Sequence, residues 1–558
     1  MKTDSVLKTR NANWLHYWLA CGLIVLATLV SYHRTFNYPF HFDGQVTVQA
    51  NPDFQKLDWD SIPTRTRQLV ALTWQLNHVA DGGSLVGYHV VNIAIHVFAG
   101  LLLFVFVDRT LQLPSVPTRY REPGLLLAAA IAILWVVHPL QTQSVTYIVQ
   151  RYESLMGMFF LLAMVCLAWG ASSKRGWPWY AGGIIASFAA VLCKEVAIVL
   201  PLVMLWYDRA FLASSWRQLL RQRGLFYAGL FASWLILAQV IWVPTSQHAV
   251  SGVVQVEEIE YTAQGPIRHV IGPKEYLYSQ AKAIPFYLRL TLVPDGQSLD
   301  HGWRGTYSLT EAILPGLVVI AALGLTGWAV VRSPQLSFVG GWFFLILAPT
   351  SSILPIKDIV FEHRMYLPLA APLTLIVLGL WEAIRRLAPK DDVPAQSRKL
   401  IAAMTLLVVI YGGVTLARNE VYRSDEAMWL DVIAKNPMHE RGYHGLAHAY
   451  ILQGDWEAAI PFLEKTMALN PNYPFDPYYG ESLFQAAQLS IAQGNVEGTI
   501  TLLDLSIRLN PSDPEPYVLM AQILQRHSPA QSVALLKVAL KLDPDYLEAR
   551  ELLSQLRP

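Results

Sequence analysis

Long apolar segments fill the first 420 residues, and they constrain the fold more than any other feature. A helix needs about 20 mostly apolar residues to cross the hydrocarbon core of a membrane. Segments that meet or approach this length lie at residues 14–32, 86–108, 123–138, 154–171, 177–193, 196–210, 224–243, 310–331, 337–353, 366–383 and 400–417. Only 15% of the chain is charged, against roughly 25% in an average soluble domain. We therefore predict an all-α chain that begins with a polytopic bundle of about 11 transmembrane helices.

Basic residues predict the orientation of this bundle. Lysines and arginines precede the first segment and follow the second, fourth, sixth, eighth and tenth, for example Lys8, Arg121, Arg223 and Arg385. Cytoplasmic loops of membrane proteins carry such an excess. We therefore expect a cytoplasmic N-terminus, long outer loops at 33–85 and 244–309, and an extracytoplasmic C-terminal part. Within the second loop, residues 275–293 are a candidate interfacial helix.

The last part of the chain is repetitive. Helix-ending pairs recur at Asn436-Pro437, Asn470-Pro471, Asn510-Pro511 and Asp543-Pro544, with spacings of 34, 40 and 33 residues. A period near 34 residues is typical of tetratricopeptide repeats. Gly454 and Gly494 mark turns between paired helices, the third repeat lacks such a glycine, and residues 546–556 resemble a capping helix. The expected domains are 1–420 in the membrane and 421–558 as an α-solenoid, which binds partners or serves as a rigid spacer.

Several kinds of fold and function receive no support from the sequence. The three cysteines, Cys21, Cys166 and Cys193, all lie in or beside apolar segments, which argues against a disulfide framework. A net charge of +1 gives no electrostatic case for nucleic-acid binding. The chain also has no phosphate-binding glycine loop and no closely spaced metal-ligand pair.

Polar clusters at the expected outer ends of the apolar segments are the candidate site, because charge is costly at membrane depth and tends to be functional. They comprise His41 and Asp43 in the first outer loop; His138, Gln141, Gln143, Tyr147, Gln150, Arg151 and Glu153; the pair Lys194-Glu195; and Lys357, Asp358, Glu362, His363, Arg364 and Tyr366. Each has a structural alternative, such as an aspartate cap, a snorkelling lysine or an ion-pair network.

These clusters resemble the membrane O-mannosyltransferase-like proteins that carry transmembrane and tetratricopeptide repeats, which are GT-C glycosyltransferases. The resemblance covers nearly the whole chain. It rests on FHFDG…NP (40–52), LTWQLN (72–77), GYHVVNIAIHV (87–97), HPLQTQSVTYIVQRYESLMG (138–157), KEVAIVLPLVMLWYD (194–208), APTSSILPIKDIVFEHRMYLP (348–368) and RNEVYRSDEAMWLDVIAKNP (418–437).

The resemblance implies sugar transfer from a polyprenyl-phosphate donor to hydroxyl groups of an exported protein. Asp43 matches the first position of the family's two-acid motif and would be the catalytic base, whereas Gly44 occupies the second. Asp53, Asp58 and Asp60 are reserve candidates in the same loop. Donor phosphate would be neutralised by Arg151, Lys194, Arg289 and Arg364. Expected substrate-binding residues are His41, His138, Gln150, Glu153, Glu362, His363 and Tyr366.

The resemblance leaves several points open. No cofactor is implied with certainty, and because Gly44 replaces an acid, a role for a divalent metal is undecided. The expected partners are the lipid donor and an exported protein that the repeats hold, and the expected location is a bacterial inner membrane. The alternatives are a non-catalytic scaffold whose repeats recruit exported partners, and a glycosyltransferase that acts on a lipid or polysaccharide.

Overall fold

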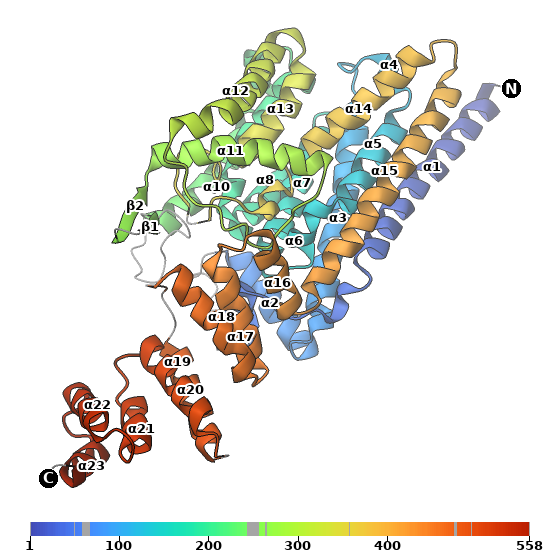
Figure 1. The fold of residues 1–558 in the computed structure, drawn as a ribbon. Helices are drawn as coiled ribbons and strands as arrows, with labels where there is room; N and C mark the ends of the chain where they lie inside the picture. The colour runs from blue at the N-terminus through green and yellow to red at the C-terminus, as the bar shows by residue number, and fades with distance from the viewer. Residues whose placement is uncertain are drawn as a thin grey trace. The chain divides into compact units, whose positions relative to one another are not determined.

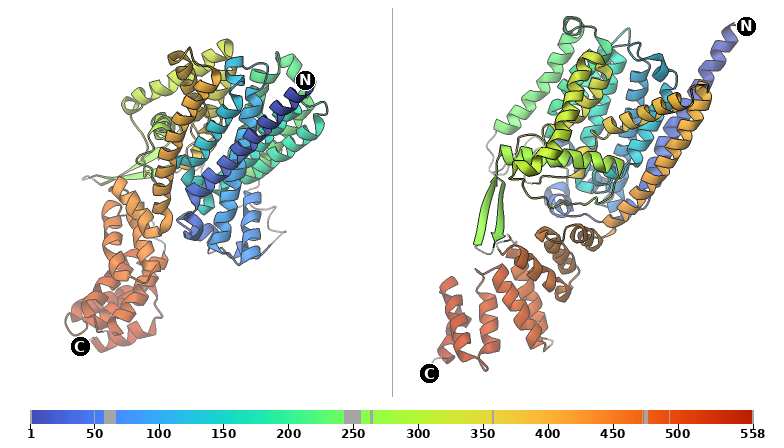
Figure 2. Two further views of the ribbon diagram at one scale, coloured as in Figure 1. Left: turned by 90° about the vertical axis from the view of Figure 1, so that its right-hand side faces the viewer. Right: turned by 45° about the horizontal axis from the view of Figure 1, so that its top comes forward.

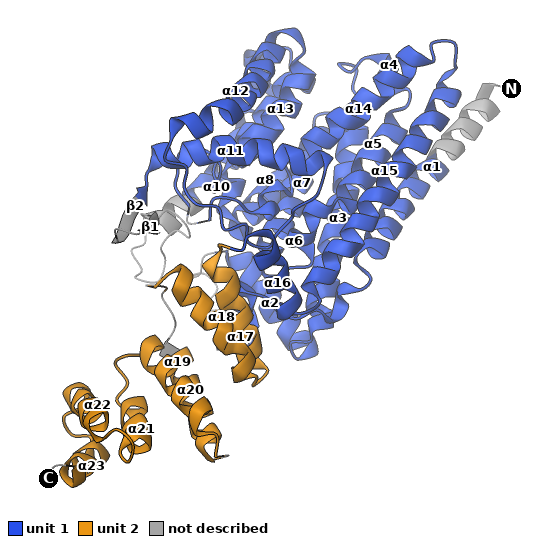
Figure 3. Cartoon of the chain, in the orientation of Figure 1, with its two compact units in different colours: residues 1–437 blue, residues 438–558 orange. Residues whose placement is uncertain are grey.

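A computed structural model describes residues 2–49, 51–57, 67–242, 256–262, 265–356, 358–471, 473, 477–492 and 494–556. The chain divides into two compact units, Met1–Pro437 and Met438–Pro558 (Figure 3). The first unit holds the apolar segments, and the second holds most of the repeats.

The first unit is a helical bundle, and every predicted apolar segment lies on one of its helices (Figure 1). These are α1 (Lys2–Tyr32), α3 (Leu85–Leu111), α5 (Gly124–Val137), α7 (Arg151–Gly170), α8 (Trp177–Cys193), α9 (Leu200–Tyr207), α10 (Trp216–Trp242), α12 (Leu309–Arg332), α13 (Pro334–Leu347), α14 (Ala370–Leu387) and α15 (Val393–Glu420). α1 and α15 run side by side (Figures 1 and 2), and Asn419 donates a hydrogen bond of 2.9 Å to the Ser31 carbonyl. The predicted all-α architecture is confirmed.

The number of helices able to cross a membrane is smaller than the eleven expected. Among the described residues, five helices are long and apolar enough to span, and a pair bent by 56° at residues 124–145 would make six. α8 and α13 are apolar but have 17 and 14 residues, fewer than the roughly 20 that a perpendicular crossing needs. The chain is thus a multi-pass membrane protein, while eleven crossings stay a prediction.

Glycines allow the helices of the bundle to approach one another closely. Because lipid tails are as apolar as the helix surfaces, helices in a membrane associate through close packing at small residues. A Cβ atom at Gly100 would lie 2.4 Å from Val136, and one at Gly157 would lie 2.6 Å from the Tyr366 ring. In the most apolar stretch of α7, 78% of the residues are buried, against 6% in that of α12. We therefore regard α7 as the central helix. The segments next to α7 therefore sit at the middle of the bundle.

Both long loops contain ordered elements. The first includes η1 (Thr35–Asn37), the π-helix η2 (Gln45–Gln49), η3 (Pro52–Phe54) and α2 (Gln68–Asp81). The second includes α11 (Pro273–Leu292), which confirms a helix at the predicted interfacial segment. It also contains an antiparallel hairpin of β1 (Val256–Thr262) and β2 (Gly265–Ile271), in which Val256 pairs with Ile271. The hairpin was not predicted, because its short strands carry little apolar alternation.

The division between the units falls after Pro437 rather than after residue 420. Helix α16 (Asp425–Lys435) belongs to the first unit because side chains at both of its ends bind loops of that unit. His41 contacts Asp425 at 2.5 Å, and the Asn436 amide donates to the His301 carbonyl at 3.1 Å. These polar contacts could not be foreseen from composition.

The second unit consists of paired helices. They are α17 (Glu440–Leu452), α18 (Trp456–Leu469), α19 (Pro477–Ala492), α20 (Val496–Leu509), α21 (Glu515–Leu524), α22 (Pro529–Leu542) and the final helix α23 (Leu547–Leu556). Gly454 and Gly494 have φ values of 77° and 81°, a left-handed conformation that glycine adopts at little cost. The predicted turns and the capping helix are confirmed. Buried residues such as Leu463 and Leu503 form one core, and Leu536 and Leu553 contribute to another.

Candidate functional site

Four segments far apart in the sequence meet at one end of the bundle in the first unit. Arg67, at the start of α2, contacts Glu195, which follows α8. The backbone N–H of His363, before α14, donates to Gln143 at 2.7 Å, and Gln143 lies in the short helix α6 (Thr142–Val145) between α5 and α7. Three of the predicted polar clusters therefore come together in the folded chain.

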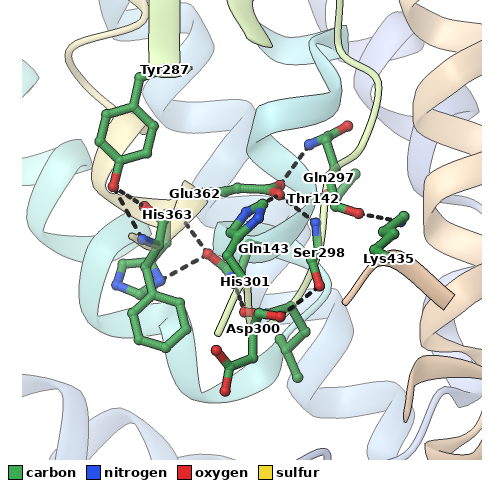
Figure 4. A network of polar contacts seen from close by, with 12 residues as sticks. Thr142, Gln143, Tyr287, Gln297, Ser298, Asp300, His301, Glu362, His363 and Lys435 are labelled. Atoms are coloured by element: carbon green, nitrogen blue, oxygen red, sulfur yellow. Dashed lines mark hydrogen bonds and ion pairs between the residues drawn. The ribbon is translucent and has the colours of Figure 1, made fainter. Parts of the chain in front are cut away.

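Glu362 is the centre of a buried hydrogen-bond network (Figure 4). Its carboxylate is fully buried and accepts from the Ser298 N–H at 2.7 Å, from Gln297 Nε2 at 2.7 Å and from His301 Nε2 at 3.0 Å. Burial alone would raise the pKa of Glu362, but His301 and the backbone N–H lower it below its usual value. These three groups hold Glu362 ionised and in place, so we assign it to ordering the 297–301 loop.

His363 lies between this network and a group of cations. Its Nδ1 is 3.0 Å from Gln143 Oε1, and its ring stacks on the Phe361 ring with the ring centres 5.0 Å apart. Burial, followed by the positive charges of Lys194, Arg364 and Arg67, holds the pKa of His363 well below its usual range. Three cations therefore act on a neutral imidazole here, and positive charge of this kind favours an anion nearby.

Arg67 is a site residue that the sequence analysis missed. Its Nη2 donates to Glu195 Oε1 at 2.8 Å, and its guanidinium lies 4.5 Å from the centre of the Tyr152 ring. Although burial acts against ionisation of Glu195, the charge and hydrogen bond of Arg67 lower the pKa of Glu195 to about 2. The only sequence signal was an arginine immediately before α2 in a loop expected on the outer side.

Backbone strain accompanies these residues. In the described part of the chain, Phe42 and Arg67 are the two non-glycine residues with positive φ, at 44° and 56°. Such conformations cost about 1–3 kcal/mol and persist only where the surroundings enforce them. Both residues lie in the loop between α1 and α3. Phe42 is next to Asp43, the predicted base, and Arg67 is one of the cations around His363.

Lys194 forms a buried ion pair with Glu153. Lys194 is 7% exposed and Glu153 is 2% exposed, and the ammonium contacts the Glu153 carboxylate directly. Because Glu153 begins α7 and Lys194 follows α8, the pair joins two predicted clusters. Within the group, three cations (Arg67, Lys194 and Arg364) face two carboxylates (Glu153 and Glu195).

Asp43 lies in an exposed turn next to this group. The turn is closed by hydrogen bonds from Gly44 N–H to the His41 carbonyl at 2.8 Å and from Gln45 N–H to the Phe42 carbonyl at 3.1 Å. The negative charge of Asp43 acts on the phenols of Tyr147 and Tyr152. Tyr152 also carries the Arg67 guanidinium on its ring, so the carboxylate and the cations approach the same side chain.

Gly44, which replaces an acid in the family pattern, is buried in the same turn. A Cβ atom there would meet Phe40 at 3.6 Å and Tyr147 at 3.8 Å, which are ordinary contacts. Space alone therefore does not explain the glycine. Among the described residues, no three His, Cys, Asp or Glu side chains come together to hold a metal ion.

Two predicted phosphate ligands lie apart from the cationic group. Arg151 is fully buried, and its guanidinium donates to Asn92 at 2.6 Å, to Asn77 at 2.7 Å and to the Tyr88 carbonyl at 3.0 Å. These partners give it the role of joining α2, α3 and α7. Arg289 is half-exposed on α11 and pairs with Asp295.

Arg364 remains within the cationic group, although its donors order a loop. It donates to the backbone carbonyls of Ile359 at 2.8 Å and Asp358 at 2.5 Å. Burial disfavours its charge, but Tyr287, Tyr276 and Asp358 raise the pKa of Arg364 above its usual value. It is a permanent positive charge beside His363.

Most other predicted substrate contacts have structural partners. His138 donates to the Thr291 carbonyl at 3.0 Å, Tyr366 is 3.0 Å from His96 Nδ1, and both are fully buried. His41 binds α16. Gln150 is partly buried and its side-chain oxygen has no hydrogen-bond partner among the described residues. Asp53 lies in η3, while Asp58, Asp60 and Lys357 lie outside the described residues.

Comparisons with known proteins point to one group of relatives. The chain is 30% identical to the Homo sapiens protein O-mannosyl-transferase TMTC4 over 197 residues, which cover 30% of this chain and 26% of that protein. It is 32% identical to Drosophila melanogaster Tmtc1 over 185 residues, covering 30% and 20%. The match to Mus musculus TMTC4 is 23% identical over 495 residues, covering 79% and 65%.

Other comparisons add little. No protein-family profile matches the chain. The solved structure titled APC/C hetero-tetramer Cut9-Hcn1 matches 90% of this chain and 100% of that chain at 12% identity, with a TM-score of 0.19, too low to support a statement about fold. The chain spans between a fifth and two thirds of the curated relatives named above. Those relatives are protein O-mannosyl-transferases, which confirms the resemblance that its motifs predicted.

Proposed function

We propose that this chain is a GT-C type glycosyltransferase that moves a sugar from a polyprenyl-phosphate-linked donor to hydroxyl groups of an exported protein on the outer side of the membrane. One observation carries the proposal. Asp43 and Arg67 approach the same tyrosine, Tyr152, while Lys194 and Arg364 place further positive charge around His363. The names of the relatives make mannose the first sugar to test.

The cations are suited to stabilising the phosphate that leaves in the reaction. As the bond between the anomeric carbon and the phosphate oxygen breaks, negative charge grows on the phosphate, and fixed positive groups stabilise this charge without reorganising. Arg67 has a planar fork of donors, the geometry that binds carboxylate or phosphate through two hydrogen bonds, and it holds Glu195 in this structure. We assign Arg67, Lys194 and Arg364 to this role because their charges act together on His363. We remove Arg151 and Arg289, whose charges do not act on it.

Asp43 is suited to the role of the catalytic base. It is exposed, so an acceptor can reach it, and it stands beside the cationic group rather than inside it. In the proposed step the acceptor hydroxyl oxygen bonds to the anomeric carbon, its proton passes to Asp43, and the polyprenyl phosphate leaves. The tetratricopeptide repeats of the second unit support a protein acceptor, because such solenoids commonly hold peptides on their concave face.

The direct test uses the full chain in lipid nanodiscs with polyprenyl-phosphate mannose and a serine- and threonine-rich peptide. Glycan transfer is measured by mass spectrometry. The Asp43→Asn variant should lose transfer while the protein stays folded, whereas Asp53→Asn and the exposed repeat variant Asp504→Asn should keep it. Loss in Asp53→Asn alone would move the base, and transfer by Asp43→Asn would refute the assignment.

A kinetic test addresses the phosphate site. Replacing Arg67 by lysine keeps the charge but removes the two-pronged hydrogen-bonding geometry. We expect the KM for the lipid donor to rise roughly tenfold, with a smaller change for the acceptor peptide. An unchanged donor KM in Arg67→Lys and in Arg67→Gln would place the phosphate elsewhere. In cells, exported proteins should lose a sugar mass when the gene is deleted.

A further inference from the structure

Helix α16 binds both loops that frame the candidate site, although it lies outside the site itself. Its first residue, Asp425, contacts the loop that carries Asp43. Its last residue, Lys435, contacts the 297–301 loop, whose side chains bind Glu362. The eleven-residue helix begins with a cap, in which the Ser424 hydroxyl oxygen accepts a hydrogen bond of 3.1 Å from the Ala427 N–H. It therefore has a defined start from which Asp425 points at the first outer loop.

The contact with the first outer loop is made by the His41 side chain. His41 is 1% exposed, its Nδ1 lies 2.5 Å from Asp425 Oδ1, and its Nε2 lies 2.7 Å from the Tyr422 carbonyl. Each ring nitrogen of His41 therefore faces an oxygen, one of Asp425 and one of Tyr422, and these two contacts fix the orientation of the ring. Asp425 Oδ2 accepts a further hydrogen bond from Gln45.

These contacts bracket Asp43 on both sides. His41 and Gln45 lie two residues before and after it, and the intervening turn contains Phe42 in its left-handed conformation. The Phe42 ring packs edge-on against Trp429 of α16, with ring centres 5.6 Å apart. A strained turn persists only where neighbours over-determine it, and three of its residues are held by one helix.

The other end of α16 holds the second loop. Lys435 Nζ binds the Gln297 carbonyl (Figure 4), and Asn436 Nδ2 donates to the His301 carbonyl at 3.1 Å. Gln297 and His301 are the side chains that bind the Glu362 carboxylate. One rigid helix thus sets the spacing of the two loops, and the chain continues from it through Pro437 into the repeats.

We propose that α16 is the positioning element of the site, and that Asp425 is the residue that fixes, through His41, the turn presenting Asp43. This rests on the proposed function. Asp425 touches no reacting atom, so its loss should lower the rate of the chemical step and leave donor binding intact.

Kinetics of the full chain in nanodiscs test this. Asp425→Ala should lower kcat by roughly ten- to a hundredfold, the range expected for a misplacement of about 1 Å, with an unchanged donor KM. Asp425→Asn keeps an acceptor for His41 and should fall between Asp425→Ala and wild type. Ala434→Ser, on the exposed side of α16, is the matched control. Equal kcat in Asp425→Ala and wild type, or a change confined to donor KM, would overturn the inference.

A second measurement does not depend on activity. Amide hydrogen exchange of residues 40–49 should become about tenfold faster or more in Asp425→Ala, because hydrogen bonds to charged groups contribute more than neutral ones, while residues 85–111 keep their exchange rates. Phe42→Gly, in which the left-handed backbone is unstrained, should show the same local change without unfolding. Unaltered exchange in both variants would overturn the inference. If the wild-type chain transfers no sugar but the two variants show these exchange changes, only the proposed function is overturned.

Discussion

Replacing Lys194 by methionine removes one partner of a buried ion pair in the candidate site. The pair is almost completely withdrawn from water, with Lys194 7% and Glu153 2% exposed. Breaking such a pair leaves an unpaired charge in a medium of low polarity and typically costs about 3–5 kcal/mol. We therefore expect Lys194→Met to lower the free energy of unfolding of the first unit by about that amount.

The double variant separates charge from packing. Methionine at both positions has a length similar to lysine and glutamate, and replacing a whole buried pair by apolar side chains is often neutral or stabilising. Lys194→Met/Glu153→Met should therefore unfold within about 1 kcal/mol of wild type, although each single variant is less stable. Because Lys194 is also a proposed phosphate ligand, the double variant should bind the lipid donor more weakly while remaining folded.

Unfolding is followed by tryptophan fluorescence during a denaturant titration of the full chain, with circular dichroism as a check on helix content. The cycle of two single variants and one double variant gives the coupling energy of the pair directly. A Lys194→Met protein as stable as wild type would mean that the pair is not desolvated. A double variant as unstable as the single one would mean that Lys194 contributes packing, not charge.

Two further predictions concern the repeats and the bundle. Burial, together with the charges of His448 and Arg441, lowers the pKa of His444 to about 4, so the second unit should lose stability as pH falls from 6.5 towards 4, by about 2 kcal/mol at pH 5. His444→Phe, which keeps an aromatic ring against Tyr473, should remove this dependence in thermal melts at pH 7 and 5, and an equal loss in both proteins would refute it. Gly157→Ala should destabilise the bundle by about 1–3 kcal/mol through overpacking against Tyr366, whereas Gly412→Ala, with nothing within 4 Å of its Cβ, is the control; equal thermal stability would show that the Tyr366 ring yields.

Local features were readable from the sequence alone. Apolar length predicted the helices of the bundle, because a chain in lipid must satisfy its own backbone hydrogen bonds within each segment. The period near 34 residues predicted the paired helices, and Gly454 and Gly494 predicted their turns. Glu362 and His363 were found as candidates because polar residues stand out at the end of an apolar helix.

Roles within the site were decided only by tertiary structure. Arg151 and Arg67 look alike in the sequence, yet Arg151 is surrounded by Asn92 and Asn77 inside the bundle, and Arg67 lies beside Glu195, 128 residues away. Likewise, α16 joined the first unit because Asp425 meets His41. A charged side chain shows what it can bind but not which partner will reach it, since that depends on helix packing between segments distant along the chain.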